Sequence, residues 1–162
     1  MENILEKEPV KRVQEFINQF DPKLKVLVLD TTARTAKDAA HSLDVEVGAI
    51  VKSLVFKTPK KKLYYLCLVS GDKLISLNKL SLNVNDLVEK ASANEVKSQT
   101  GYSIGGVPPV AHINSPTQIF IDLNLKRFAK IYAAAGHPYC VFGITFKQIC
   151  EITNGKVIDF VD

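Results

Sequence analysis

Apolar residues recur along the chain with two different periods, which predict helices and strands in an irregular order. Over 9–20 they fall at positions 10, 13, 17 and 20 behind a proline, the spacing of an amphipathic helix. A second helix is predicted over 35–43, with Thr35 as its N-cap and a face of small residues. Further helices are predicted over 84–91, 93–100 and 146–153, with one helical turn over 125–130. Strands are predicted over 24–30, 50–58, 63–70, 74–77, 118–122, 131–135, 139–145 and 156–161.

This order of elements predicts the fold class. Strands that follow each other through short turns, such as 50–58 and 63–70 around Pro59, indicate hairpins, and the helices are interspersed irregularly. We therefore expect an α+β fold with a mixed, mostly antiparallel, barrel-like sheet and surrounding helices. At 162 residues the chain is predicted to be one domain, with an N-terminal helix in 1–22 and a core over 23–162.

Composition narrows the class of protein. With 46% hydrophobic and 23% charged residues the chain is globular, and no apolar run is long enough to span a membrane. The acidic first residues lack the apolar core of a secretory signal. Cys67, Cys140 and Cys150 have no metal-binding spacing. We expect them to be reduced thiols in a cytoplasmic protein, with no zinc site and no disulfide framework.

The net charge of +4 is only a mild preference for polyanionic partners. Basic residues nevertheless gather in two places, and a further arginine precedes the predicted helix at 35–43. Each could be a solvated surface residue or a contact for the phosphates of a nucleic acid. The candidates are Arg34, Lys60, Lys61, Lys62, Lys126, Arg127 and Lys130.

One lysine falls in an unexpected place. Strand alternation over 50–58 puts Lys52 on the same face as Ile50, Leu54 and Phe56. Its stem could lie on the core while the ammonium reaches water, as on an edge strand. Alternatively, the ammonium could point into a pocket, where partial desolvation strengthens its electrostatic effect. Both interpretations fit the pattern.

The stretch 101–109 combines three glycines with two prolines and cannot form an ordinary helix or central strand. It predicts a loop, which could be a simple connection or could present backbone N–H groups to a ligand. A second turn, Gly136-His137-Pro138, carries a histidine that could be inert or functional.

The sequence lacks the motifs of several common kinds of catalytic site. The sequence has no Walker loop, no G-x-S-x-G elbow and no H-E-x-x-H. His41, His112 and His137 are scattered, without carboxylates at ligand spacing. A conventional catalytic triad or a metal hydrolase is therefore not expected.

Three segments, in order and at matching spacing, resemble the signatures of the YbaK-like aminoacyl-tRNA deacylases. This family also forms the editing domain inserted in bacterial prolyl-tRNA synthetases. The segments are 48–56 around Lys52, the loop with its Gly-x-x-x-Pro element from Gly105 to Pro109, and Gly136-His137-Pro138. The similarity runs from about residue 31 to residue 162. Ser53 stands where many relatives carry threonine or asparagine, which leaves the substrate open.

The resemblance implies a trans-editing hydrolase that cleaves the ester of a mischarged tRNA, most simply a small amino acid on tRNA(Pro). It implies that Lys52 is the essential residue, that the glycine-rich loop shapes the pocket and that the Gly-His-Pro turn discriminates substrates. No metal or organic cofactor is implied, and neither DNA nor a membrane. The expected partners are an aminoacyl-tRNA and, as a further candidate, an aminoacyl-tRNA synthetase. The implied substrate-binding residues are Ser53, Gly101, Ile104, Gly105, Gly106, Val107, Pro108, Pro109, Gly136, His137 and Pro138.

The residues themselves are compatible with this chemistry. Ester hydrolysis needs an attacking water and stabilisation of an oxyanion, which Lys52 and the N–H groups near Gly105 and Gly106 could supply. The ribose hydroxyl of the substrate could hold the water. The alternative functions are a non-catalytic module that binds aminoacyl-tRNA or a synthetase, and an esterase for small molecules.

Overall fold

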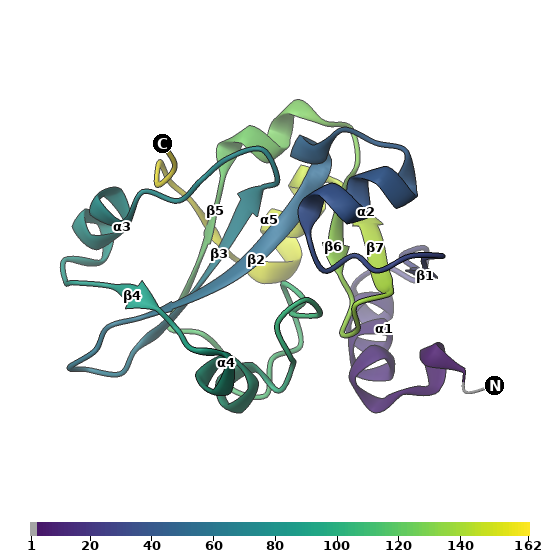
Figure 1. Cartoon of the computed structure of the whole chain (residues 1–162), viewed down its shortest axis with the longest axis horizontal. Helices are drawn as coiled ribbons and strands as arrows, with labels where there is room; N and C mark the ends of the chain where they lie inside the picture. The colour runs from purple at the N-terminus through teal and green to yellow at the C-terminus, as the bar shows by residue number, and fades with distance from the viewer. Residues whose placement is uncertain (1–2) are drawn as a thin grey trace.

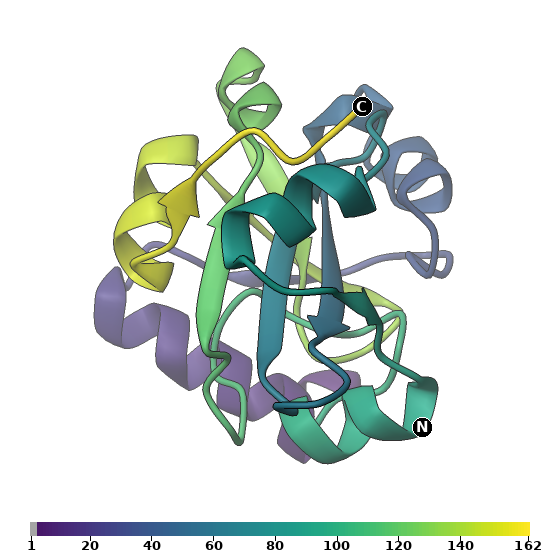
Figure 2. The same cartoon turned by 90° about the vertical axis from the view of Figure 1, so that its left-hand side faces the viewer.

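The computed structural model describes residues 3–162 and builds them around one mixed sheet (Figure 1; Figure 2). The α-helices are α1 (Glu8–Phe20), α2 (Ala36–Leu43), α3 (Leu77–Val84), α4 (Ala93–Thr100) and α5 (Phe146–Thr153). The strands are β1 (Val26–Val28), β2 (Ile50–Lys57), β3 (Tyr64–Ser70), β4 (Glu89–Lys90), β5 (Gln118–Ile121), β6 (Ile131–Ala134), β7 (Cys140–Ile144) and β8 (Lys156–Val157). Three short 3-10 helices are η1 (Ile4–Glu6), η2 (Val47–Ala49) and η3 (Leu123–Arg127).

The strand order is β1-β7-β6-β2-β3-β5-β8, and β4 pairs with β2 on the same edge as β6, farther along the strand. Pairing is antiparallel for β1–β7, β6–β7, β2–β3 and β2–β4, and parallel for β2–β6, β3–β5 and β5–β8. Antiparallel pairs predominate. The predicted α+β fold with a mixed, mostly antiparallel sheet and surrounding helices is confirmed.

Strand alternation divides the core between the two faces of the sheet. On β3, Leu66 and Leu68 join the larger cluster, which includes residues of α1 and α5, while Tyr65, Cys67 and Val69 face the other way. That second cluster lies under α3, as Figure 2 shows with α3 and α5 on different sides of the strands. Each face buries a nearly continuous set of apolar side chains, the pattern expected for a sheet covered on both faces.

The predicted N-terminal helix is confirmed and packs onto the sheet. Its residues Val10, Val13 and Ile17 are fully buried in the larger cluster, which follows from their helical spacing. The division into a helix at 1–22 and a core at 23–162 stays a prediction.

The sequence prediction is wrong between 74 and 91. The expected strand at 74–77 forms only an isolated bridge, Ile75 with Val161, and α3 begins at Leu77. Ser76 caps this helix by accepting the Lys79 N–H at 3.2 Å. The expected helix at 84–91 does not form, because Asn85 adopts a left-handed conformation that ends α3, and β4 then pairs with β2.

Cys67 and Cys140 are buried free thiols, and Cys150 is a partly buried one. Burial raises the pKa of the Cys140 thiol to about 11, so it stays protonated near neutral pH. Within residues 3–162, no helix has the length and apolar character required to cross a membrane.

Candidate active site

Lys52 lies in the middle of the sheet, on β2 opposite Val69 of β3. As predicted, it shares a face with Ile50, Leu54 and Phe56, which join clusters under α2 and α3. Its side chain is partly buried, and its ammonium donates to the backbone oxygen of Lys73, in the turn after β3. The aliphatic part of the Lys52 side chain therefore lies on the core face of the strand, while its ammonium has the Lys73 carbonyl as hydrogen-bond acceptor.

The pKa of Lys52 reflects this position. Burial lowers it below the usual value for lysine, and the nearby carboxylates of Asp72 and Asp122 oppose that effect. Among residues 3–162, no carboxylate forms a salt bridge with Lys52. The ammonium is therefore held near negative charge but not neutralised by direct contact.

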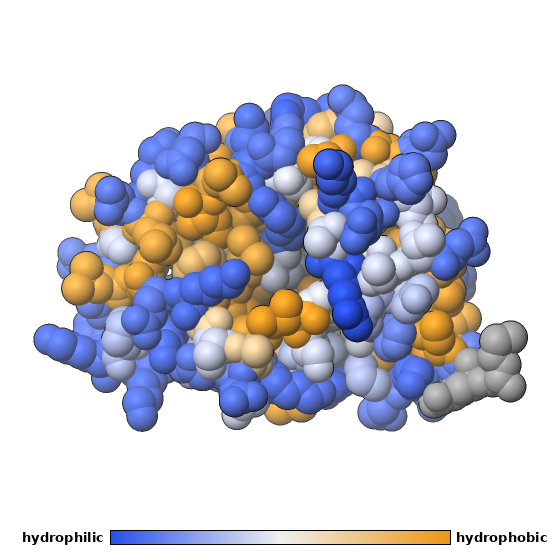
Figure 3. Space-filling view, viewed as in Figure 1, coloured by the Kyte–Doolittle hydropathy of each residue, from blue (hydrophilic) through white to orange (hydrophobic). Residues whose placement is uncertain are grey.

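A cavity of about 300 Å³ lies beside Lys52, between β2, α2, β4 and the glycine-rich loop. Figure 3 shows the surface hollowed on this side, next to the apolar surface over α3 and β4. The lining is mostly small and aliphatic, and its charged members are all basic: Arg34, Lys52 and Lys90. Other lining residues include Ser53, Ala36, Ala39, Ala91, Ile104, Gly105, Val107 and Ala134.

The edge of β2 that faces this cavity is open. Pairing with β6 ends at Val51, and pairing with β4 begins at Phe56, so no described strand covers the edge between them. On this edge the Val55 carbonyl accepts the Ala91 N–H at 3.0 Å. Because backbone groups alternate along a strand, Ser53 directs its N–H and its carbonyl to the same edge. The cavity wall therefore offers a backbone donor and acceptor to a ligand.

The side chain of Ser53 adds a third polar group. Its hydroxyl oxygen is buried and has no hydrogen-bond partner among the described residues. Buried polar groups are nearly always paired, so an orphan hydroxyl in a cavity wall calls for a specific explanation. The oxygen is shielded, so a ligand in the cavity could become its partner only if neighbouring side chains moved aside.

The glycine-rich loop forms another wall of the cavity, and its shape is fixed from behind. Ile104, Gly105 and Val107 line the cavity, and a Cβ at Gly105 would lie 3.2 Å from the Arg34 side chain. Gly105 also has a φ of 96°, which favours glycine. The buried Tyr102 donates its hydroxyl to the Ala111 carbonyl at 2.8 Å.

The same loop is held at its proline end by His112. Its Nε2 lies 2.7 Å from the Pro108 carbonyl, so this nitrogen carries the proton. Burial lowers the pKa of His112, which favours the neutral ring in this contact. Pro109 lies beyond it and lines a separate hollow with His112 and Phe16.

The Gly-His-Pro turn lies behind the loop, not in the cavity. Gly136 N–H donates to the Gly106 carbonyl at 2.9 Å, and a Cβ at Gly136 would lie 2.7 Å from the Pro9 carbonyl. Gly106, Gly136, His137 and Pro138 line a second hollow with the start of α1. The structure therefore places this turn against the back of the loop and against the N-terminal helix.

Of the candidate residues, the structure brings six together around the cavity. These are Arg34, Lys52, Ser53, Ile104, Gly105 and Val107. Gly101 lies at the end of α4 as its left-handed C-cap, and the remaining loop and turn candidates are not among the residues that line the cavity. These are Gly106, Pro108, Pro109, Gly136, His137 and Pro138.

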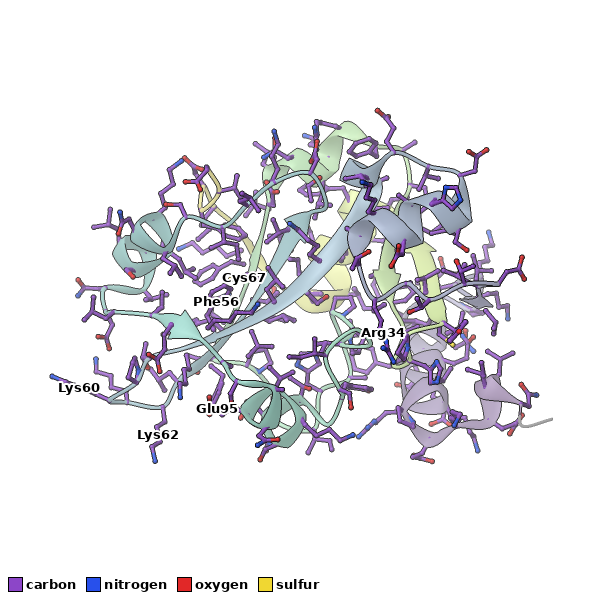
Figure 4. The ribbon with its side chains drawn as sticks, viewed as in Figure 1. Arg34, Phe56, Lys60, Lys62, Cys67 and Glu95 are labelled. Carbon is purple, nitrogen blue, oxygen red and sulfur yellow. The ribbon has the colours of Figure 1, made fainter. Side chains whose placement is uncertain are left out.

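The basic candidates are spread over the surface. In Figure 4, Lys60 and Lys62 project outward from the hairpin tip, far from Arg34 at the cavity. Lys61 lies 3.9 Å from the Asp86 carboxylate. Lys126 and Arg127 lie in η3 and Lys130 follows it, and Arg127 is engaged by Asp72 at 2.7 Å.

Sequence reasoning misses two features of the site. Lys90 lines the cavity from β4, in a segment predicted as helix, so its position could not be foreseen. The pair of Asp72 and Arg127 joins residues far apart in the chain, and Asp72 by its local sequence is an ordinary turn residue. Within residues 3–162, no cluster of histidine, cysteine or carboxylate side chains could hold a metal ion.

Comparisons with known proteins show the family of this chain. A family model described as "Aminoacyl-tRNA editing domain" matches residues 30–152. The protein YwhH of Bacillus subtilis is 30% identical over 148 residues, which cover 91% of this chain and 93% of YwhH. The proline–tRNA ligase of Lactobacillus acidophilus is 32% identical over 130 residues, which cover 79% of this chain and 22% of the ligase.

A solved structure extends the similarity to the whole fold. The crystal structure of a protein described as a candidate trans-editing enzyme for prolyl-tRNA synthetase superposes with a TM-score of 0.89 at 37% identity. The superposition covers 96% of this chain and 98% of that one. The match from residue 30 to residue 152 includes Lys52, its cavity and the glycine-rich loop, and the chain belongs to the aminoacyl-tRNA editing domain family.

Proposed function

We propose that this protein is a trans-editing deacylase, which hydrolyses the ester between a wrongly attached amino acid and the terminal ribose of a tRNA. The observation that carries the proposal is the Lys52 ammonium, held at the wall of a small cavity without a carboxylate partner among the described residues. A cation available in a partly desolvated site is suited to stabilise a developing oxyanion.

The reaction needs no protein nucleophile. Water attacks the ester carbonyl, a bond forms between its oxygen and the carbonyl carbon, and negative charge collects on the carbonyl oxygen. Lys52 stabilises that charge. The ester bond to the ribose oxygen then breaks, and the proton from the water reaches the departing oxygen through the neighbouring ribose hydroxyl. The products are the free amino acid and the uncharged tRNA.

The cavity favours a small amino acid. Its volume of about 300 Å³ is at the lower end for ligand sites, and alanine side chains at 36, 39, 91 and 134 line it. The aminoacyl amine can meet the Ser53 carbonyl on the open edge of β2. Similarity to a proline–tRNA ligase, and to a protein described in relation to prolyl-tRNA synthetase, points to tRNA(Pro) as the carrier.

The basic lining fits a nucleic-acid substrate. Arg34, Lys52 and Lys90 face the cavity, and no acidic residue is among its lining residues. Positive charge at the mouth attracts the terminal phosphates of a tRNA and raises the encounter rate. A neutral ester of a small molecule would gain little from this arrangement.

The test is single-turnover deacylation of tRNA(Pro) charged with alanine, cysteine, serine or proline, by the wild type and by Lys52→Ala. We expect the wild type to release a small non-cognate amino acid and Lys52→Ala to lose that activity while still binding tRNA. Lys57→Ala, on the same strand, serves as the control and should retain the activity. Binding of all these tRNAs without turnover by the wild type would contradict the proposal and favour a non-catalytic binding module. Turnover of free amino-acid esters without dependence on tRNA would favour an esterase.

A further inference from the structure

The turn at 70–73, which follows β3, supplies the acceptor for the Lys52 ammonium. Lys73 N–H donates to the Ser70 carbonyl at 2.9 Å and closes the turn, and the Lys73 carbonyl accepts from Lys52. The turn packs closely on η2, because a Cβ at Gly71 would lie 2.2 Å from the Val47 carbonyl. The position of the Lys52 ammonium therefore depends on where this turn is held.

An ion pair holds the turn from the outside. Arg127 donates from Nη1 to Asp72 Oδ2 at 3.1 Å and from Nη2 to Asp72 Oδ1 at 2.7 Å. Nη2 also donates to the Ser70 hydroxyl at 2.8 Å, and Nε donates to the Asn124 carbonyl at 2.7 Å. Every nitrogen of the guanidinium has an acceptor, so the orientation of Arg127 is fixed. Its guanidinium is therefore committed to the turn, and a tRNA phosphate would have to compete with Asp72 for it.

A buried carboxylate fixes the same turn from the inside. Asp122 is 2% exposed, and its Oδ2 accepts the Ser70 N–H at 3.0 Å. Its Oδ1 accepts both the backbone N–H of Asn124 at 2.9 Å and the Asn124 side-chain amide at 2.7 Å. The end of β3, the start of η3 and the turn are thus joined in one polar network.

The exposure of the ion pair bears on its role. The side chains of Asp72 and Arg127 are 38% and 40% exposed. Exposed ion pairs contribute little to folding stability, whereas bidentate arginine–carboxylate contacts fix geometry well. The pair is better suited to set the position of a turn than to stabilise the fold.

Both acidic and basic groups surround Lys52. The carboxylates of Asp72 and Asp122 favour its charged form, and burial opposes it. Further charged groups near the site are Lys73 in the turn, Arg127 in η3, Glu46, which faces Arg127, and Arg34 and Lys90 in the cavity lining. Removal of the Asp72 charge therefore leaves Lys52 in surroundings that are more positive as well as desolvated.

We propose that Asp72 and Arg127 are positioning residues for Lys52. Their ion pair fixes the turn, and the Lys73 carbonyl then holds the ammonium at the cavity wall. The inference rests on the proposed catalytic role of Lys52, and it predicts that two residues outside the cavity lining control the rate.

The test compares Asp72→Asn and Arg127→Gln with a matched control, Asp159→Asn. Asp159 forms an exposed ion pair with Lys79 at 3.2 Å, away from the cavity lining. In single-turnover deacylation we expect both test variants to lose roughly tenfold to 100-fold in maximal rate, the scale typical of a misplaced catalytic group, with unchanged tRNA affinity. The control should match the wild type.

The dependence of rate on pH separates charge from geometry. Asp72→Asn removes a carboxylate that favours the ammonium, so the loss of activity at alkaline pH should move to lower pH. Arg127→Gln leaves that carboxylate in place, so the alkaline limb should not move to lower pH although the rate falls. If Arg127→Gln fails to fold, Arg127→Lys keeps the charge without the bidentate contact and should likewise be slow with an unmoved limb.

A second measurement needs no substrate. The modification of Lys52 by an amine-reactive reagent, followed by mass spectrometry as a function of pH, reports how readily the amine loses its proton. The midpoint should lie at lower pH in Asp72→Asn than in the wild type and Asp159→Asn. Wild-type rates and an unmoved labelling midpoint in Asp72→Asn would overturn the positioning role. A wild type without deacylase activity but with the expected labelling shift would overturn the proposed function alone.

Discussion

Two lysines of β2 lie near its two ends, on opposite faces, and their surroundings differ. Lys57 forms ion pairs with Glu95 of α4 and, at 3.4 Å, with Glu89 of β4. These ion pairs connect both elements to β2. The hydrogen bond to Glu95 raises the pKa of Lys57. Lys52 has only a backbone carbonyl as a direct partner among the described residues, and burial lowers its pKa.

The two lysines differ in whether carboxylates of the protein neutralise their positive charge. At Lys57 the positive charge is compensated within the protein, and Glu95 in turn caps α4, with a carboxyl pKa held at about 2 by the lysine. At Lys52 the nearest carboxylates act through space and leave the ammonium free to meet a ligand. A charge that the fold does not neutralise is the better candidate for a catalytic group.

The strongest way to test this comparison is to replace each lysine by methionine. Lys52→Met should lower the single-turnover deacylation rate roughly 100-fold or more, because the oxyanion loses its cation. Its thermal stability should stay near that of the wild type. Lys57→Met should show the opposite result, a lower melting temperature with activity retained. Equal loss of activity in both variants would contradict the division of roles.

The pH dependence should sharpen the same contrast. Activity that needs the Lys52 ammonium is present at neutral pH and is lost as pH rises through its pKa, which burial places below the usual 10.5. Replacement of Lys57 should leave this alkaline limb in place. The measurement is the single-turnover rate between neutral and strongly alkaline pH, with folding followed by circular dichroism. A deacylation rate that falls at alkaline pH only where the protein unfolds would contradict the attribution of this loss to Lys52.

Ser53, the neighbour of Lys52, should contribute to substrate binding rather than to the stability of the fold. Ser53→Ala removes a buried hydroxyl without a partner among the described residues, so we expect the free energy of unfolding to rise by about 1 kcal/mol. Weaker binding of the aminoacyl end should accompany it, seen as a higher substrate concentration at half-maximal rate. A loss of stability on chemical denaturation would show that the hydroxyl has a structural partner.

The smallest effect is expected at the hairpin tip, at the far end of β2 from Lys52. Replacement of Lys60, Lys61 and Lys62 by serine should weaken tRNA binding only a few-fold. The slope of log affinity against log salt should fall by about one for each lysine that pairs with a phosphate in the complex. An unchanged slope would exclude these lysines from the tRNA interface, while the deacylation rate of bound substrate should be unaffected.

Local signals in the sequence are sufficient for much of the fold. The long strands β2 and β3 and the helices α1, α2 and α5 follow from clear periodicity and caps. The error at α3 has a local cause: Asn78, Ser81 and Asn83 are weak helix formers, and the helix depends on Ser76 at its start and on burial of Leu80. The two residues of β4 owe their strand geometry to pairing with β2, which no local pattern reveals.

The residues of the site also divide into those that local sequence predicts and those that only tertiary contacts reveal. Lys52 could be singled out because an ammonium on an apolar strand face violates the usual pattern, and Gly105 because the loop needs its conformational freedom. The cavity walls from α2 and β4, and the contact of Asp72 with Arg127, arise only when distant segments meet. The position of His137 behind the loop could not be predicted either, because it follows from the docking of α1.

The open edge of β2 also bears on the solubility of the protein. Unpaired strand edges invite the strands of other molecules and are a common origin of aggregation. Among residues 3–162, the stretch without a paired strand on this edge runs only from residue 52 to residue 55, and the Val55 carbonyl within it already accepts from Ala91. A foreign strand would need a longer run of free backbone groups to pair with β2, so the shortness of this gap limits edge-to-edge association.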